Sequence, residues 1–332
     1  MKKVLLGLTI LMFAFTVGAT ASWAASEPII IKMGHVVAQS EPTHKAALEW
    51  AKQVKARTKG GIEIQVFPSA QLGKNRDVYE QARMGAPVVG QIDPGYAAEF
   101  GSPNLSVLQG PFLINTMTEY NNLVNSELVK KWNDQLLEQS GLRILTWNWY
   151  FGSRHIISDK GFKTVDELNG LKIRCPPNPV WVDTFKTLGA TPVTIAWAEV
   201  YTGLSQGVVE AAEAPLSTLL GSKLFEVKKT ITLTGHFNAI SGLVISDKVF
   251  KSLSPEWQTI LVEEAINAGN MMTEMTVNGQ DGYKKELTAN GVTFVEPEIE
   301  GFKQKSKAFY TDSSVSKKWY KGIYEDVQAA MK

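Results

Sequence analysis

The feature that most constrains this fold is an alternation of β-rich runs with helical patterns. Residues 28–34 are rich in isoleucine, residues 46–54 place apolar side chains at helical spacing, and residues 62–67 alternate apolar and polar side chains. Residues 76–84 predict a second helix, which Gly85 ends ahead of a strand at 87–92. This order of strand, helix, strand, helix and strand predicts a parallel sheet.

A second stretch with the same alternation begins near residue 152. Thr164 and Glu167 have the spacing of a helix capping box, and Gly189 follows a helical pattern. The stretch predicts strands at 171–174, 191–195 and 208–213 and helices at 180–188 and 198–204. Two such units predict an α/β protein with two lobes and a ligand cleft between them.

The division of the chain follows from its length and from one long helical pattern. With 332 residues the chain exceeds the usual size of a single core. The pattern at 255–289 predicts one long helix, or two helices joined near Gly279, that brace both lobes. We expect a first lobe at 25–151 plus 240–279 and a second at 152–239 plus 280–332.

The N-terminus has the pattern of an export signal. Lys2 and Lys3 precede an apolar run at 4–17, and Ser22 and Ala24 are the small residues that a signal peptidase requires. The run is shorter than the ~20 residues of a membrane-spanning helix. We therefore expect cleavage after Ala24 and a soluble protein in the periplasm.

Charge and metal-binding residue types exclude several classes of function. The chain has 34 Lys and Arg against 33 Asp and Glu, which argues against a nucleic acid or an anionic membrane as partner. The single cysteine, Cys175, excludes an internal disulfide, and the four histidines form no HxxxH pair. No phosphate-binding GxxxxGK[ST] loop is present, so we do not expect ATP hydrolysis. We also expect neither a bound metal nor a cofactor.

Arg174 is the strongest candidate for a functional residue. It ends the strand at 171–174, and Pro176 and Pro177 then turn the chain. Open α/β sheets bind ligands beyond the carboxyl ends of their strands, and a planar guanidinium matches a carboxylate. The alternative is an exposed arginine in an ordinary ion pair. The position predicts capture of an organic acid.

Other candidate contacts have weaker physical support. Trp197 and Trp149 are aromatic residues near predicted strand ends, where a flat side chain can line a pocket or pack in a core. His35, Glu41, Asp93 and Asn238 lie at predicted turns or crossings. A helix cap or a solvated turn explains these residues equally well.

Four segments, taken together, resemble the solute-binding proteins of tripartite ATP-independent periplasmic (TRAP) transporters of the dicarboxylate (DctP) type. They are residues 69–73 (SAQLG), 166–174 (DELNGLKIR), 197–204 (WAEVYTGL) and 209–215 (VEAAEAP). The resemblance covers essentially the whole mature chain. It implies two α/β domains joined by crossing strands and a long helix, which close over an organic acid and deliver it to a membrane permease.

The resemblance also implies roles for individual residues. Arg174 stands where the family binds the substrate carboxylate, and Arg154 stands where a second arginine often assists. Members that bind sialic acid have asparagine where this chain has Ala214, which argues against sialic acid and favours less polar ligands. Two alternatives remain, namely a periplasmic sensor subunit and an enzyme that uses Cys175 with His155 or Asp183.

Overall fold

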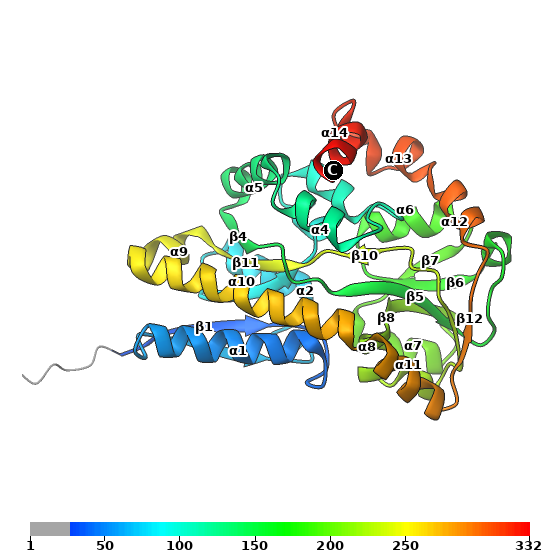
Figure 1. Ribbon diagram of the computed structural model, residues 1–332, viewed down its shortest axis with the longest axis horizontal. Coiled ribbons are helices and arrows are strands. Elements are labelled where there is room, and N and C mark those ends of the chain that lie inside the picture. Colours follow the sequence, from blue (N-terminus) through cyan, green and yellow to red (C-terminus); the bar gives the residue numbers. More distant parts are fainter. Residues whose placement is uncertain (1–26) are drawn as a thin grey trace, which may run out of the picture.

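The computed structural model describes residues 27–332 and contains two β-sheets, each covered by helices on both faces (Figure 1). The expected α/β fold with two lobes is confirmed. The export signal and the cleavage after Ala24 lie outside the described residues and stay predictions.

The first sheet joins strands from distant parts of the chain. Strand β1 pairs in parallel with both β2 and β3, whereas β11 pairs antiparallel with β3 and β4. The strand order is β2 (Ile62–Phe67), β1 (Ile29–Gly34), β3 (Val88–Ile92), β11 (Gly242–Ser246) and β4 (Leu142–Thr146). The three parallel strands are those that the first alternation predicts.

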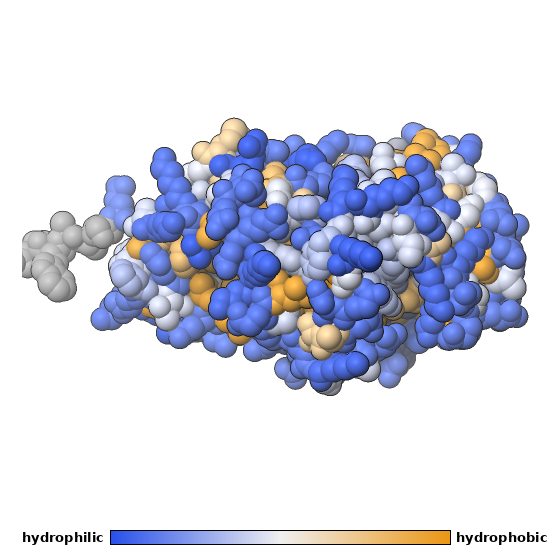
Figure 2. Space-filling model, turned by 90° about the horizontal axis from the view of Figure 1, so that it is seen from above, coloured by the Kyte–Doolittle hydropathy of each residue, from blue (hydrophilic) through white to orange (hydrophobic). Residues whose placement is uncertain are grey.

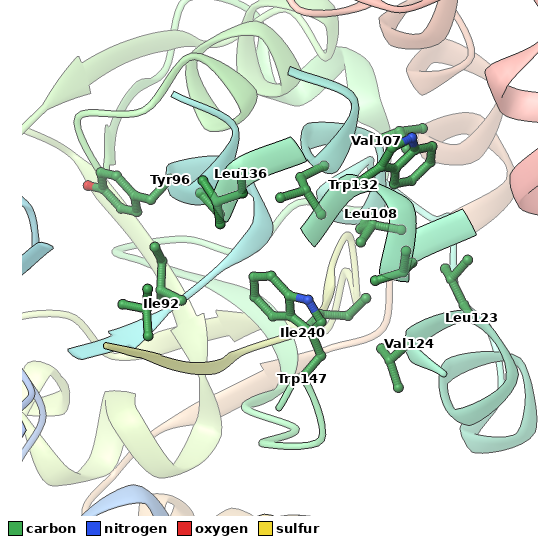
Figure 3. Packing of buried hydrophobic residues seen from close by; sticks show 14 of the residues in the cluster. Ile92, Tyr96, Val107, Leu108, Leu123, Val124, Trp132, Leu136, Trp147 and Ile240 are labelled. Carbon is green, nitrogen blue, oxygen red and sulfur yellow. The ribbon is translucent and has the colours of Figure 1, made fainter. Parts of the chain in front are cut away.

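Helices cover both faces of the first sheet. One face packs against α1 (Pro42–Arg57) and α10 (Pro255–Asn278), and α9 (Asp247–Ser252) follows β11. The other face packs against α2 (Asn75–Arg83), α3 (Pro94–Ala98), the 3-10 helix η1 (Pro103–Gln109), α4 (Met117–Val124), α5 (Glu127–Ser140) and α14 (Ile323–Ala330). Figure 3 shows the cluster on this second face, with Trp132 beside Val107 and Tyr96 at its edge.

The second sheet is mixed. Its order is β12 (Thr293–Val295), β9 (Thr230–Thr232), β5 (Gly152–Ser158), β8 (Ala211–Pro215), β6 (Lys172–Cys175) and β7 (Thr191–Thr194), and β10 (Asn238–Ala239) pairs with β5. One face packs against α6 (Pro179–Thr187), α12 (Ile299–Ser306) and α13 (Phe309–Asp312). The other packs against α7 (Val200–Ser205), α8 (Leu216–Gly221) and α11 (Gln280–Ala289). Short 3-10 helices are η2 (Val165–Leu168), η3 (Trp197–Glu199), η4 (Leu224–Glu226) and η5 (Ser316–Lys318).

The chain crosses between the sheets along two paired segments. Residues 147–151 lead from β4 to β5, and residues 240–241 lead from β10 back to β11. The backbone N–H of Trp149 donates to the carbonyl of Ser241 at 3.1 Å, so the two crossings support each other. The Trp149 indole N–H also donates to the Ala265 carbonyl of α10 at 2.9 Å, which ties this long helix to the crossings.

Three details differ from the expected elements or were left open by the sequence. The long helical pattern forms two helices, α10 and α11, that meet at Gly279. The strand expected at 208–213 is instead β8, because the backbone N–H groups of Val208 and Val209 bond to Gly203 and prolong the turn after α7. The last helix, α14, packs on α4, α5 and η1 of the first lobe, although 280–332 is expected in the second lobe. The remaining domain boundaries stay predictions.

The surface seen from above is mostly hydrophilic, with apolar residues in small separate groups (Figure 2). Among residues 27–332, none of the helices combines the length and the apolar character that crossing a bilayer requires.

Candidate functional site

A cavity of about 290 Å³ lies between the lobes. The first lobe contributes the end of β3, the start of α3, the end of η1 and residues 74–77. The second lobe contributes residues of β5, β6 and β8 and the tryptophans of α6 and η3. The cavity therefore lies where the carboxyl ends of β3 and β6 meet, as expected for open α/β sheets.

Arg174 is buried in the cavity wall without an acidic partner. Only 3% of the residue is exposed, and its Nε donates to the Ile195 carbonyl at 2.8 Å. Among the described residues, no carboxylate lies within ion-pair distance and no acceptor bonds to either Nη atom. Burial lowers the pKa of Arg174 to about 10, although the charge of Glu213 opposes this shift. Arg174 therefore stays cationic at neutral pH.

Arg154 lines the same cavity but is already paired. Its Nη2 donates to Glu213 Oε1 at 2.7 Å and to the Glu213 carbonyl at 3.1 Å, and its Nε donates to Oε2. Burial alone would raise the pKa of Glu213, but the charge and hydrogen bonds of Arg154 outweigh burial and lower it to about 2. The ring of His236 lies 3.3 Å from the same carboxylate. This pairing leaves only Nη1 of Arg154 for a further partner.

The first lobe contributes polar groups to the opposite wall. Asp93 caps α3 by accepting the Tyr96 backbone N–H at 2.9 Å. Burial raises the pKa of Asp93 to about 7, against the lowering effect of that N–H and of Arg154. Gln91 projects from β3 and donates to Ser241 Oγ at 2.9 Å. Gln109 ends η1 and also lines the cavity.

Aromatic rings cover both second-lobe arginines. The Trp197 ring centroid lies 5.1 Å from the Arg174 guanidinium carbon, and its indole N–H donates to Ser222 at 3.1 Å. Trp181 lies 5.6 Å from the guanidinium carbon of Arg154. Rings at these distances stabilise a cation and exclude water from it. Trp197 is expected at the site from its place in the chain, and the structure brings it to the cavity.

The lobes touch each other around the cavity. Thr218 of α8 donates to the buried carboxylate of Glu41 at 2.6 Å, and Lys74 pairs with Glu199 at 2.9 Å. A Cβ added at Gly95 would lie 2.9 Å from Asn178 Oδ1, which is closer than side-chain contacts allow. Gly95 therefore lies in a close contact between the lobes, beside a cavity that is partly open to solvent.

The structure brings some of the expected site residues together and not others. Arg174, Arg154, Trp197, Asp93 and Ala214 all line the cavity, whereas Glu41 lies behind it at the contact with Thr218.

Three expected residues lie elsewhere. Trp149 is fully buried in the core beside α10. His35 bonds to His44 at 3.1 Å, and burial lowers its pKa to about 4. Asn238 accepts from the Tyr150 hydroxyl at 2.7 Å in a separate, smaller cavity. All three point away from the cavity because they form contacts inside the protein.

Among the described residues, Cys175 forms no hydrogen bond with His155 or Asp183, the residues considered for covalent catalysis. Cys175 is fully buried, and burial raises the pKa of its thiol, opposite to what a nucleophile requires. Asp183 accepts from the Ser314 hydroxyl at 2.6 Å, and His155 accepts from the Gly235 N–H at 3.2 Å. Within residues 27–332, no group of three or more His, Cys, Asp or Glu side chains could hold a metal ion.

Sequence reasoning missed Gln91, Gln109 and Glu213. Gln91 and Glu213 had a readable signal, because each is a polar residue inside an otherwise apolar strand. Gln109 had none, since it lies in a 3-10 helix without apolar periodicity.

Known structures and proteins are similar over most of the chain. A structure from Ochrobacterium anthropi with bound L-fuconate has a TM-score of 0.88 and 30% identity, and covers 92% of this chain and 100% of its own. An apo open structure from Escherichia fergusonii, also 30% identical, covers 91% and 99% with a TM-score of 0.78. The 2,3-diketo-L-gulonate-binding periplasmic protein of Escherichia coli is 31% identical over 80% of this chain and 81% of its own.

The two α/β lobes around a cavity are shared with both solved structures, which are TRAP periplasmic solute-binding proteins. The model of the family described as bacterial extracellular solute-binding protein, family 7 (DctP), matches residues 33–316. The chain belongs to this family. Its higher similarity to the ligand-bound structure than to the open one agrees with the contacts between its lobes.

Proposed function

We propose that this protein is the solute-binding subunit of a TRAP transporter, which captures an organic acid between its lobes and delivers it to a membrane permease. Export and cleavage after Ala24 would place it in the periplasm. The observation that carries the proposal is Arg174, a buried cation that forms no ion pair with any residue of 27–332. A buried charge is costly unless it is paired, and the carboxylate of a ligand supplies the pair.

The surroundings of Arg174 support recognition of a carboxylate rather than of any anion. Its Nε is fixed on the Ile195 carbonyl, so the guanidinium plane is held and both Nη groups remain for the ligand. Two parallel N–H donors match the two oxygens of a carboxylate. Arg154 adds one further donor, Nη1, beside this position.

Closure of the lobes follows from contacts on both walls. A ligand bound to Arg174 in the second lobe and to Asp93 or Gln91 in the first would interact fully only in the closed state. Differential binding of this kind shifts the open and closed populations. The relatives support an acid as ligand, because the named proteins and structures include a diketogulonate-binding protein and a fuconate complex.

The first experiment is a thermal-melt screen of the mature protein, refolded to remove carried ligand, against mono- and dicarboxylates, sugar acids and keto acids. A ligand at ~1,000 times its Kd stabilises the folded state by about 4 kcal/mol. Calorimetry with the best acid should then show that Arg174→Ala loses about 2–5 kcal/mol of binding free energy, or roughly 30-fold to several thousand-fold in Kd.

Two variants make this test specific. Arg174→Lys keeps the charge but loses the planar fork and should recover only part of the affinity. Arg83→Ala removes an exposed arginine paired with Glu80 and should leave the Kd unchanged. Equal Kd values for wild type and Arg174→Ala would rule out the assigned role. Uptake by vesicles that contain the permease, with and without this protein, tests delivery.

A further inference from the structure

Carboxylate binding by Arg174 leaves other polar groups in the cavity unexplained. Seven buried side-chain nitrogen and oxygen atoms of residues 27–332 have no hydrogen-bond partner. Three of them belong to cavity residues, namely Nε2 and Oε1 of Gln109 and Nε1 of Trp181. Buried polar groups are nearly always paired, so unpaired groups concentrated at one cavity indicate a ligand with matching polar atoms.

Gln109 cannot reach solvent to satisfy its amide. Only 1% of the residue is exposed, and it ends η1, which packs against α3. Ser106 of the same 3-10 helix accepts from the Trp319 indole N–H at 2.7 Å. At the next residue, Gly110, an added Cβ would lie 2.5 Å from the Tyr310 hydroxyl. The backbone at Gln109 is thus held from both sides, and its amide stays in the cavity wall.

Trp181 and Asp93 lie close together in the same cavity. A Cβ built at Gly95 would lie 3.2 Å from Asp93 Oδ1 and 3.2 Å from Cζ3 of Trp181. Since η1 packs against the helix that Asp93 caps, Gln109 belongs to this wall. The three side chains line the same cavity, where they offer an amide, an indole N–H and a carboxyl group in addition to the arginines.

The chemistry of the amide discriminates between ligands. Gln109 presents one donor group and one acceptor, and a hydroxyl can satisfy both because it accepts and donates. A second carboxylate can only accept, so it would leave Oε1 unpaired and lie near Asp93. An alkyl chain would leave both atoms unpaired.

We propose that Gln109, with Trp181 and Asp93, selects an acid that carries a hydroxyl group away from its carboxylate, in preference to an alkyl acid or a dicarboxylate. This proposal rests on the proposed binding of a carboxylate by Arg174. The proposal also replaces the expectation of a less polar ligand, which was based on Ala214. Ala214 removes an amide from the second lobe, but Gln109 supplies one from the first.

The test is calorimetry on the mature protein with acids of equal chain length that differ in one chemical feature. Hexanoate, gluconate and adipate form one series, and butyrate, D-erythronate and succinate form another. Wild type should bind the hydroxylated acid of one series at least about 10-fold more tightly than its two partners. Gln109→Leu should weaken binding of that acid by about 10- to 100-fold and leave the alkyl acid within about threefold.

The outcomes separate this proposal from the one on which it rests. Equal affinity of wild type for the hydroxylated and alkyl acids, or an equal loss of both in Gln109→Leu, overturns the role of Gln109 while the acid-binding function stands. No binding of any acid in either series overturns the preference for these hydroxylated acids, and the melt screen then decides separately whether the protein binds another organic acid. Arg174→Ala should instead weaken all bound acids alike, whichever side group they carry.

A second variant covers the case in which Gln109→Leu does not fold, which a melt without ligand reveals. Trp181→Phe keeps an aromatic ring and removes the indole N–H together with the second ring of the indole. We expect it to weaken the hydroxylated acid by about 3- to 10-fold and to leave the alkyl acid unchanged. An unchanged affinity for the hydroxylated acid, or an equal loss of both, contradicts the proposal.

Discussion

Arg154 and Arg174 are two buried arginines of one cavity wall, and they differ in their partners. Arg154 is paired through two of its nitrogens with the carboxylate of Glu213. Within the part of the chain that the structure describes, Arg174 donates only to the backbone carbonyl of Ile195. Removing a charge from water is unfavourable for both residues, but only Arg154 is compensated inside the protein.

The difference indicates where each residue contributes free energy. The Arg154–Glu213 pair is complete in the folded protein, so we expect it to act mainly on stability. The charge of Arg174 is uncompensated, so we expect it to act mainly on binding. Burial alone does not separate these two roles, because both arginines are almost fully buried.

The buried carboxylates of Glu213 and Glu41 differ in the same way, because only Glu213 forms an ion pair within residues 27–332. Arg154 holds the pKa of Glu213 at about 2 despite burial. Glu41 forms no ion pair with the described residues, and burial raises its pKa to about 7, against the hydrogen bonds from Thr218 and Ala38. Glu213 therefore stays charged at neutral pH, whereas Glu41 takes up a proton as the pH falls through about 7.

The largest expected effect comes from breaking the complete pair. Glu213→Gln leaves Arg154 buried without a carboxylate and should lower the free energy of unfolding by about 3–5 kcal/mol. Urea denaturation measures this change. The control is Glu80→Gln, whose exposed ion pair with Arg83 should contribute at most about 1 kcal/mol. A loss below 1 kcal/mol in Glu213→Gln would show that the pair is not a stabilising unit.

The next effect is a pH dependence that comes from Glu41. Its folded pKa exceeds the ordinary value of 4.5, so its contribution to stability is full below that pH and is lost as the pH rises towards 7. Between pH 4.5 and 7.5, wild type should therefore lose about 2–4 kcal/mol of unfolding free energy relative to Glu41→Gln. Asp93 titrates equally in wild type and in Glu41→Gln, so the difference between their unfolding free energies reports on Glu41 alone. Parallel curves would contradict the assignment.

A smaller effect is expected from removing the uncompensated cation. Arg174→Met, without ligand, should leave the free energy of unfolding unchanged or raise it by about 1 kcal/mol, because the variant no longer buries a charge. Urea denaturation of ligand-free protein is the measurement. A loss above 3 kcal/mol would mean that Arg174 stabilises the fold as Arg154 does.

The smallest effect belongs to the exposed ion pair across the lobes. Lys74→Ala should weaken ligand binding by at most about 1 kcal/mol, or roughly fivefold in Kd, because Lys74 and Glu199 are both more than half exposed. Stopped-flow measurement of the dissociation rate at two salt concentrations tests this. Lys52→Ala, within the first lobe, should change nothing. A change above 20-fold would make this pair a major closure contact.

Much of the fold could be predicted from periodicity. The strands β1, β2 and β11 and the buried face of α1 follow directly from apolar spacing. The strands β9 and β12 could not be predicted, because each has three residues and forms only through pairing with distant segments. Pairing of this kind depends on tertiary contacts rather than on local propensity.

Residues near strand ends were predictable from the pattern of the chain, whereas Arg154 and Ala214 came from the family resemblance. Arg174 and Asp93 follow or end strands and reach the cavity. Trp149 was expected there, but Phe151 lines the cavity instead, since the crossing between the lobes is not a regular strand and its side chains do not alternate simply. The pairing of Arg154 with Glu213 joins residues 59 positions apart and needs the sheet register of β5 and β8.

The repeated crossing of the chain between the sheets limits how this protein can diversify. The strands of the first sheet come from the chain before residue 147 and after residue 241. The strands of the second sheet come from the chain between these points and from β12. The last helix, α14, then packs in the first lobe again. A single recombination point therefore cannot exchange one whole lobe for that of a relative. Exchange of a whole lobe would need at least two recombination points, whereas a substitution in the cavity wall changes the ligand contacts and leaves both lobes in place.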